Sequence, residues 1–361
     1  MLIESLKAEI ARQYGTPALV IDLDVVEHNI AKAQAYCDAA GVRNRPHIKT
    51  HKSPVLAAMQ RDAGALGITC QKLGEAEVMA AEGLDDILIT YNLLGEEKIG
   101  RLGRLSAQRM VTVAADNPIT IAGLPMAGRI AGRPINVVVE CDSGRKRAGV
   151  ETPGEAIALA EMIAASPELS FAGFVFYPPD KTVASSQRFL DEAVAGVRKL
   201  GIEPRILSSG GSPNLGMLKE FHGITEHRAG TYIYNDRMMM AHEMATLDEC
   251  ALHVYATVVS RAGEERGILD SGSKTLTSDT GGGLDGFGLI REYPQGRISG
   301  FSEEHGMLDL SKTNERPSVG TIVRIVPNHV CVVVNMFDRY VTVRGDKLIG
   351  EIDIPARGKI T

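Results

Sequence analysis

RPHIKTHK, residues 45–52, places two histidines and two lysines within eight positions. Side chains alternate between the two faces of a β-strand, so a strand here would put His47, Lys49 and His51 on one face. Pro46 suits the start of a strand and does not suit a helix interior. Three basic groups on one face need partners if they are buried. The stretch therefore indicates either a solvated basic patch or a site where neighbouring groups tune the pKa of a lysine amine.

The same stretch begins a series of eight short apolar segments. Amphipathic stretches such as GEAEVMAAEG (74–83) and SQRFLDEAVAGVRKLG (186–201) separate them and predict helices. Eight alternating strand and helix units in about 220 residues predict an α/β fold, a (β/α)8 TIM-type barrel. A doubly wound sheet is the rival fold, but its GxGxxG fingerprint does not follow the first strand. The eight segments are NRPHIK (44–49), LGITCQ (66–71), DILIT (86–90), MVTVAA (110–115), INVVVEC (135–141), FAGFVFY (171–177), RILSSGG (205–211) and ITEHRAG (224–230).

The sequence changes character after about residue 240. Valine- and isoleucine-rich stretches alternate there with glycine-rich turns such as TSDTGGGLDGFG (277–288). This pattern predicts a C-terminal β domain, a sandwich or a barrel. We assign residues 14–238 to the (β/α)8 barrel, which ALVIDLD (18–24) opens, and residues 1–13 and 239–361 to the β domain. The strand-like stretches of the β domain are LHVYATVVSRA (252–262), RGILDSGS (266–273), GTIVRIVPNHVCVVVN (320–335), RYVTVRG (339–345) and GEIDIPARG (350–358).

Composition limits the class of protein. The 361 residues are 44% hydrophobic, which is enough to bury a large core in two domains, and the net charge of -6 disfavours a general nucleic-acid binder. The first fifteen residues do not resemble a signal peptide, and no apolar run is long enough to span a membrane. The cysteines are odd in number and lack CxxC spacing, which predicts a reducing, cytoplasmic location. They are Cys37, Cys70, Cys141, Cys250 and Cys331.

Several of the predicted barrel strands end in residues that can carry chemistry. In a (β/α)8 barrel the functional side chains lie at the carboxyl ends of the strands. Here those ends offer an amine, small residues with free N–H groups, and arginines for an anion, which are the groups that a phosphorylated aldehyde cofactor needs. The strand ends are Lys49–His51, ECDSGRKRAG (140–149) with Asp142, Arg145 and Arg147, Tyr177, Ser208–Gly211, and Arg228–Thr231.

Eight motifs carry a resemblance to known proteins over nearly the whole chain. They are TPALVIDLD (16–24), RPHIKTHKS (45–53), ITCQKLGEAEVMA (68–80), DSGRKRAGV (142–150), SSGGSPN (208–214), HRAGTYIYND (227–236), EEHG (303–306) and VPNHVCVVVN (326–335). These motifs are similar to those of the fold-type III pyridoxal-phosphate enzymes, whose founding member is alanine racemase. Within that family the chain resembles the branch of D-threonine aldolase and D-serine dehydratase.

The resemblance implies that the chain binds pyridoxal 5'-phosphate. It implies that Lys49 carries the cofactor as a Schiff base, that Arg147 lies near its phenolic oxygen and that Tyr177 flanks its ring. Arg228 matches the racemase arginine that lies near the pyridine nitrogen. The residues implied to hold the phosphate are Ser209, Gly210, Gly211, Gly230 and Thr231.

PNHVC (327–331) predicts a second component of the site. If this stretch is a strand, His329 and Cys331 are two positions apart and share a face. Imidazole and thiolate together suit Zn²⁺, and two protein ligands leave open positions. The resemblance implies a divalent metal here, Zn²⁺, Mn²⁺ or Mg²⁺. Candidates for contacts around the ligands are Glu303, Glu304 and His305, and more weakly Asp270 and Asp279.

The resemblance also implies a function and an assembly. The implied activity is a lyase reaction on 3-hydroxy-D-amino acids, by retro-aldol cleavage of D-threonine to glycine and acetaldehyde, with His51 as a base. The alternative is zinc-dependent dehydration of D-serine or 3-hydroxyaspartate, in which Lys49 takes the α-proton. An amino-acid racemase and a non-catalytic cofactor-binding protein are further alternatives. The expected assembly is a homodimer with twofold symmetry.

Overall fold

The computed structural model describes residues 2–361, and the chain divides into two compact units. The first, called the β unit here, consists of Met1–Ile30, Thr50–Ser53 and Thr231–Gly358. The second, called the barrel unit, consists of Ala31–Lys49, Pro54–Gly230 and Lys359–Thr361. Helix α2 (Leu23–Ala40) contributes residues to both units. No helix among residues 2–361 is long and apolar enough to cross a membrane.

The barrel unit is built on an eight-stranded parallel sheet with the strand order β2-β9-β8-β7-β6-β5-β4-β3. A parallel bridge between His47 and Thr69 joins the chain beyond β2 to β3, so the two edges of the sheet meet. Each of the eight predicted segments overlaps one of these strands, which confirms the (β/α)8 prediction. The strands are β2 (Arg43–Asn44), β3 (Ile68–Cys70), β4 (Ile87–Ile89), β5 (Val111–Ala115), β6 (Ile135–Cys141), β7 (Leu169–Phe176), β8 (Ile206–Gly210) and β9 (Glu226–Arg228).

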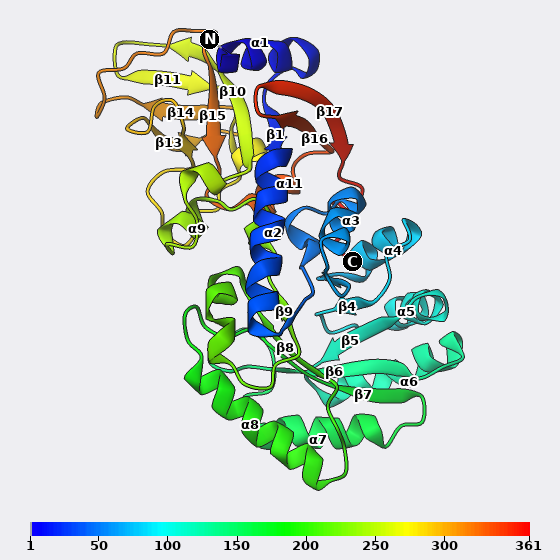
Figure 1. Ribbon diagram of the computed structural model, residues 1–361. Helices are drawn as coiled ribbons and strands as arrows, with labels where there is room; N and C mark the ends of the chain where they lie inside the picture. Colours follow the sequence, from blue (N-terminus) through cyan, green and yellow to red (C-terminus); the bar gives the residue numbers. More distant parts are fainter. Residues whose placement is uncertain (1) are drawn as a thin grey trace. The chain divides into compact units, whose positions relative to one another are not determined.

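Helices lie on the outer side of these strands (Figure 1). Local sequence signals set their ends: the Asn117 side chain caps α6 by accepting from the Thr120 N–H, and Thr152 and Glu155 form a capping box at α7. Strand β5 is buried along its whole length, as expected of a parallel strand covered on both faces. The helices of this unit are α3 (Pro54–Asp62), α4 (Leu73–Ala81), α5 (Glu96–Gln108), α6 (Pro118–Ala131), α7 (Pro153–Ala164), α8 (Ala184–Lys199) and the 3₁₀ helix η2 (Ser212–Glu220).

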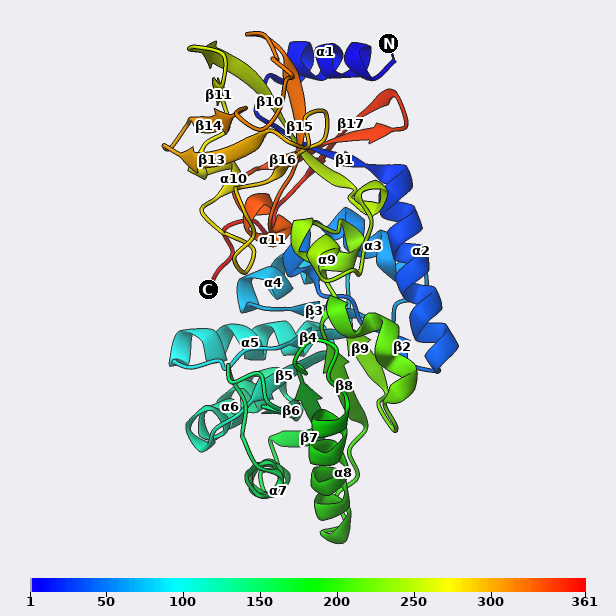
Figure 2. The same ribbon diagram turned by 90° about the vertical axis from the view of Figure 1, so that its left-hand side faces the viewer.

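The β unit contains a nine-stranded sheet with the order β11-β14-β13-β12-β15-β10-β1-β16-β17. A further pairing of β10 with β11 closes β10, β11, β14, β13, β12 and β15 into an antiparallel barrel, part of which is visible in Figure 2. The predicted C-terminal β domain is therefore confirmed as a barrel. The strands are β1 (Ala18–Asp22), β10 (Leu252–Arg261), β11 (Arg266–Leu269), β12 (Leu289–Ile290), β13 (Arg297–Phe301), β14 (Gly306–Asp309), β15 (Ile322–Val326), β16 (Arg339–Arg344) and β17 (Lys347–Asp353).

Short helices complete the β unit and connect its strands. Asp236 caps α9 by accepting from the Met239 N–H. The helices are α1 (Leu2–Tyr14), α9 (Arg237–Ala241), α10 (Ser273–Leu276), α11 (Val330–Val334) and the 3₁₀ helices η3 (Thr231–Ile233) and η4 (Leu247–Glu249), while η1 (Ile48–Thr50) spans the end of the barrel-unit segment and the start of the β-unit segment.

Strand β1 does not join the parallel sheet, although its residues lie within the segment assigned to the barrel. It pairs antiparallel with β10 and parallel with β16. Ala18 and Val20 of β1 pack in an apolar cluster with Leu6 and Ile10 of α1 and with Tyr255 of β10. Burial of this apolar face against α1 and β10 explains why β1 joins the sheet of the β unit. Local periodicity could not predict it, because it shows that a strand is apolar but not which sheet the strand joins.

Candidate active site

Lys49 lies in the 3₁₀ turn η1 (Ile48–Thr50), so the prediction of a strand through residues 45–52 is wrong. Each histidine accepts the backbone N–H two residues further on: Lys49 N lies 3.4 Å from His47 Nδ1, and Ser53 N lies 3.2 Å from His51 Nδ1. Such local bonds compete with strand pairing. The two histidines therefore shape the backbone on either side of Lys49 and do not share a strand face with it.

His47 is held as a neutral ring beside Lys49. Its Nε2 donates to Gln71 Oε1 at 3.2 Å, and the Gln71 amide in turn donates to the Thr90 carbonyl at 2.8 Å. Burial, together with the positive charges of Lys49 and Arg228, holds the pKa of His47 well below its usual value. A buried neutral imidazole thus lies among the cationic groups of the site without adding to their charge.

His51 is fully buried in the β unit, and its tautomer follows from its contacts. Because a backbone N–H can only donate, the Nδ1 that faces Ser53 N is an acceptor. The hydrogen of the neutral ring is then on Nε2. In this form Nε2 carries the hydrogen and could only donate, whereas the predicted base would need a lone pair on that atom.

The end of β8 offers a cradle that fits a phosphate group. Ser209 is fully buried, and its Oγ has no hydrogen-bond partner among residues 2–361. A Cβ at Gly211, where φ is +101°, would lie 2.4 Å from Tyr177 Cε2, so only glycine fits there. The Gly211 N–H donates to the Arg228 carbonyl at 2.9 Å. Gly211 therefore supplies space and no free donor, while the Ser209 hydroxyl supplies a donor that a phosphate oxygen would satisfy.

The other residues predicted for the phosphate are distributed between the units. Gly210 lies at the end of β8, where a Cβ would come 3.2 Å from Arg228 Nη2. Gly230 belongs to the barrel unit and Thr231 to the β unit. Within the β unit, Thr231 Oγ1 lies 4.0 Å from Cys331 Sγ. The structure thus associates Thr231 with the predicted metal ligand.

Arg228, the last residue of β9, is buried and directed by three oxygen atoms. Its Nη1 donates to the carbonyl oxygen of Ser208 at 2.7 Å and to the hydroxyl of the same residue, and its Nη2 donates to the Phe176 carbonyl at 3.2 Å. Burial lowers the pKa of Arg228 to about 10, although Glu226 opposes the shift. The guanidinium remains charged at neutral pH and is held in one direction.

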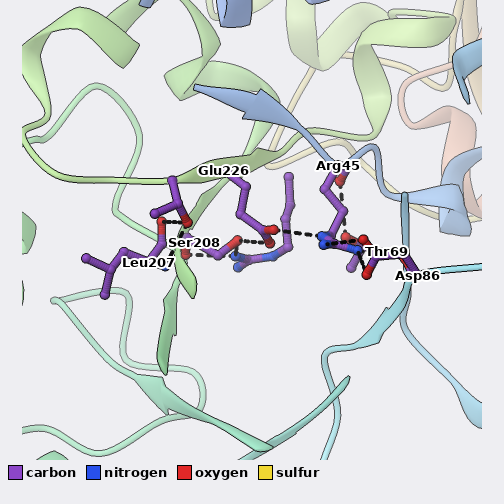
Figure 3. A network of polar contacts seen from close by, with 8 residues as sticks. Arg45, Thr69, Asp86, Leu207, Ser208 and Glu226 are labelled. Carbon is purple, nitrogen blue, oxygen red and sulfur yellow. Dashed lines mark hydrogen bonds and ion pairs between the residues drawn. The ribbon is translucent and has the colours of Figure 1, made fainter. Parts of the chain in front are cut away.

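A buried ion network supports Arg228, and the sequence did not indicate it. Arg45 Nε donates to Glu226 at 2.9 Å, and Arg45 Nη1 donates to Asp86 Oδ1 at 2.9 Å (Figure 3). The Ser208 hydroxyl that accepts from Arg228 donates to Glu226 Oε1 at 2.8 Å. Buried charges need such partners because desolvation penalises each of them. The network ties the chain after β2 to β8 and β9 beside Arg228.

Tyr177 follows β7, and two arginines of the 142–149 loop lie over its ring. The Arg145 guanidinium is 3.9 Å from the ring centroid, and its Nη2 lies 2.6 Å from Asp180 Oδ1. The Arg147 guanidinium is 5.0 Å from the same centroid and 3.8 Å from Glu140 Oε1. Arg147 is half-exposed, so its charge is the more available one for an anion. The structure thus brings the predicted Arg147 and Tyr177 together, with Arg145 as an additional neighbour.

His329 and Cys331 do not lie in a strand, so the prediction that they share a strand face is wrong. Strand β15 ends at Val326, and the five-residue helix α11 begins at Val330, directly after His329. Pro327 has no N–H with which to extend the sheet. The Val330 N–H donates instead to Asp236 Oδ2 at 3.1 Å, which holds the start of the helix.

Both predicted metal ligands have oxygen partners within the β unit. His329 Nδ1 donates to Asp279 Oδ2 at 2.8 Å, and Cys331 Sγ lies 3.2 Å from Thr50 Oγ1. Burial alone would lower the pKa of His329, but Cys331 and Asp279 outweigh it and raise the pKa to about 9. An imidazole nitrogen and a sulfur atom fit a divalent metal of the zinc type.

Of the five residues expected to surround these ligands, only Asp279 has a contact with one of them. Glu303, Glu304 and His305 are exposed, and Glu304 pairs with Lys274 at 2.9 Å. Asp270 accepts from the Thr257 N–H at 2.7 Å. Asp279, one of the two weakest candidates, is the one that contacts a ligand. Among residues 2–361 no group of three or more histidine, cysteine and acidic side chains is arranged to hold a metal.

Two family descriptions match the chain. The alanine racemase N-terminal domain matches residues 21–238, and a putative serine dehydratase domain matches residues 251–343. The chain is 32% identical over 357 residues to a D-threonine aldolase of Arthrobacter sp., covering 95% of this chain and 93% of that protein.

Solved structures of similar proteins cover almost all of the chain. The structure of D-threonine aldolase from Filomicrobium marinum superposes with a TM-score of 0.87 at 30% identity, covering 96% of each chain. A cysteine-to-alanine mutant of D-threo-3-hydroxyaspartate dehydratase, described as the metal-free form, superposes with a TM-score of 0.85 at 28% identity, covering 94% of this chain and 97% of that one.

Proposed function

The chain belongs to the family of the alanine racemase N-terminal domain, and from this premise we propose that it is a pyridoxal-phosphate-dependent lyase acting on 3-hydroxy-D-amino acids. The observation that carries the proposal is the pair His329 and Cys331, with His329 directed by Asp279. Racemisation needs no metal, whereas a lyase acting at a 3-hydroxyl group gains from one. Whole-length similarity to D-threonine aldolases supports the same class of reaction.

Residues of the barrel unit would hold both the phosphate and the pyridine ring of the cofactor. The Ser209 hydroxyl would donate to the phosphate, Arg228 would donate to the ring nitrogen, and Tyr177 would pack against the ring. When bound, the cofactor supplies an electron sink for charge that develops at the substrate's Cα. Lys49 supplies the amine that binds the cofactor and then moves protons at Cα. Neutral His47 adds no charge to this part of the site, where Lys49, Arg147 and Arg228 are the cations.

His329 and Cys331 would hold a divalent ion, Zn²⁺, Mn²⁺ or Mg²⁺. The His329 ring would bind through Nε2, because Nδ1 donates to Asp279. The ion supplies Lewis-acid chemistry to the substrate's 3-hydroxyl group. The solved structure of a D-threo-3-hydroxyaspartate dehydratase mutant in a metal-free form supports the proposal, because it implies that this similar protein also has a metal-bound form.

Within this class we propose retro-aldol cleavage of D-threonine to glycine and acetaldehyde. Similarity to two D-threonine aldolases over 95% and 96% of the chain supports it. The reaction needs a base for the proton of the 3-hydroxyl group, the role proposed for His51. That role requires His51 to accept through Nε2 and therefore to give up its bond from Ser53 N–H.

Dehydration is the second candidate, and the His51 geometry favours it. With hydrogen on Nε2, neutral His51 can donate to a hydroxyl group as the bond from Cβ breaks, while Lys49 takes the proton from Cα. The hydroxyl leaves as water, and the resulting enamine hydrolyses to a keto acid and ammonia. D-Serine and 3-hydroxyaspartate are the corresponding substrates.

We also propose that the protein is a cytoplasmic homodimer. All five cysteines are free thiols in the structure, which supports a reducing location. Light scattering at micromolar concentration tests the assembly. A fully active monomer would rule out the dimer as a requirement for catalysis.

A product assay tests the proposed function. Purified protein loaded with pyridoxal 5'-phosphate and Mn²⁺ or Zn²⁺ is incubated with D-threonine, D-serine and D-threo-3-hydroxyaspartate, and aldehyde is measured separately from keto acid and ammonia. Acetaldehyde with glycine is the expected result, and keto acid with ammonia would identify the dehydratase instead. Interconversion of enantiomers without either product would refute the lyase proposal.

A further inference from the structure

We propose that Asp279 is a positioning residue of the metal site, because its carboxylate fixes the tautomer and the direction of the His329 ring. This inference rests on the proposed function, in which His329 and Cys331 hold a divalent ion. It assigns a specific task to the glycine-rich loop of residues 277–288, which carries Asp279.

Both oxygens of the Asp279 carboxylate are engaged. Oδ2 accepts from His329 Nδ1 at 2.8 Å, and Oδ1 accepts from the Gly281 N–H at 2.7 Å. The carboxylate cannot turn away from the histidine without losing the second bond. A hydrogen held on Nδ1 leaves the lone pair of the neutral ring on Nε2, which is the atom that can bind a metal. Carboxylates commonly orient metal-binding histidines in this way.

The loop that carries Asp279 is fastened to the segment that carries His329. The Asn328 side-chain amide donates to the Asp279 carbonyl at 3.2 Å and to the Gly286 carbonyl at 2.9 Å. Arg237 Nη1 donates to Asn328 Oδ1 at 2.6 Å, and Arg237 Nη2 donates to the Asp285 carbonyl at 3.0 Å. The residue directly before His329 therefore holds both ends of the loop in register with the ring.

Backbone strain near Asp279 points the same way. Thr277 has a φ of +64°, a region that β-branched residues rarely adopt. Its hydroxyl accepts from the Asp279 N–H at 3.3 Å. Strain of this kind persists only where the surrounding contacts determine the conformation, and it is concentrated at functional sites. The unfavourable backbone conformation of Thr277 therefore lies two residues before Asp279, whose carboxylate contacts His329.

The test compares two isosteric variants in the same loop. Asp279→Asn removes the charge that contacts His329, and Asp285→Asn removes a surface carboxylate that pairs with Arg297 at 2.6 Å. Binding of Co²⁺ and Zn²⁺ to the full-length protein loaded with pyridoxal 5'-phosphate is measured by calorimetry, and the Co²⁺–thiolate absorption is recorded. Asp279→Asn is expected to weaken metal binding about 10–100-fold and to shift the Co²⁺ spectrum. Asp285→Asn is expected to match the unsubstituted protein in both, and the cofactor absorbance should stay unchanged in both variants.

A measurement on the unsubstituted protein removes dependence on the folding of a variant. Long-range ¹H–¹⁵N correlation of the Zn²⁺-loaded, histidine-labelled protein should show His329 protonated at Nδ1. Protonation at Nε2 would overturn the inference, as would equal Co²⁺ and Zn²⁺ affinities for Asp279→Asn and Asp285→Asn. If the unsubstituted protein binds neither ion, the proposed metal site itself fails, and that outcome is distinct from a site that binds metal without help from Asp279.

Discussion

The two predicted sites are positioned by different means in the two units. In the barrel unit the key side chains follow the ends of parallel strands: Lys49 comes shortly after β2, Tyr177 follows β7, and Arg228 ends β9. Parallel pairing between neighbouring strands sets the spacing of such residues, whatever side chains surround them.

In the β unit the ligands depend on individual contacts from distant segments. His329 precedes a five-residue helix whose first N–H binds Asp236, and its ring binds Asp279. Cys331 contacts Thr50, which is 281 positions away in the chain. The backbone position of a barrel strand end is therefore set by strand pairing, whereas the position of each metal ligand should respond to the loss of a single side-chain partner.

Lys49→Ala should lower the turnover of the best substrate by at least about 10³-fold, because it removes both the amine that binds the cofactor and the group that moves protons. Steady-state rates and cofactor absorbance measure the two losses. Borohydride reduction followed by peptide mapping of the unsubstituted protein provides the control. Recovery of the reduced adduct on Lys52 would show that the assignment of Lys49 is mistaken.

Removal of the metal should lower turnover by several orders of magnitude and leave cofactor absorbance unchanged. Lewis-acid activation contributes several kcal/mol, and each ~1.4 kcal/mol is tenfold in rate. Exhaustive chelation, Cys331→Ala and His329→Ala should agree, with metal content checked by elemental analysis. Full activity in a metal-free preparation would show that Cys331 is only a packed thiol and would favour a racemase.

Glu226→Gln should destabilise the barrel unit by about 3–5 kcal/mol, because it leaves the charge of buried Arg45 with only one carboxylate partner. The matched control is Glu203→Gln, which breaks an exposed pair with Arg198 and should leave the unfolding midpoint unchanged. Urea unfolding followed by circular dichroism measures both. Equal midpoints for the two variants would show that the network does not stabilise the barrel unit.

Acid should destabilise both units through buried neutral histidines. Burial lowers the pKa of His227 in the barrel unit and of His253 in the β unit to about 3, well below the ordinary value of 6.5. Below pH 6.5 the two histidines bind protons in the unfolded chain but stay neutral in the folded protein. The free energy of unfolding therefore falls by up to about 1.4 kcal/mol per pH unit for each ring, down to about pH 3.

The measurement is a series of urea unfolding curves between pH 7 and pH 4. His253→Leu should reduce the slope of stability against pH, because it removes one of the two rings. An unchanged slope in that variant would mean that His253 is protonated in the folded state.

Thr50→Val should have the smallest effect, a loss of about 1 kcal/mol or roughly fivefold in metal affinity, since it removes one neutral contact to Cys331 Sγ. Calorimetric titration with Zn²⁺ measures the loss. Thr50→Ser keeps the hydroxyl and should bind as the unsubstituted protein does. If Thr50→Val also binds normally, the hydroxyl does not support the thiolate.

Much of the fold was predictable from local pattern. The barrel strands β3 to β9 were located because buried parallel strands are short apolar runs between amphipathic helices, whereas the segment expected for β2, NRPHIK (44–49), overlaps that strand only at Asn44. The strands β12, β13 and β14 were missed, since they have two, five and four residues and too little alternation to detect. For the candidate site, residue type was the useful signal: an amine at Lys49 suggested a cofactor, and an imidazole and a thiol at His329 and Cys331 suggested a metal.

Motifs and periodicity are local properties of the chain, so they were enough to predict the family, the two kinds of fold and the chemical groups of the site. Tertiary structure alone decided that Asp279 and not Glu303 or Glu304 meets His329, and that Arg45 pairs with Glu226 beside Arg228. It also decided that the histidines beside Lys49 bind backbone N–H groups. Hydrogen bonds depend on distances of about 3 Å, and for residues 50 to 281 positions apart those distances are set by packing, which no local pattern encodes.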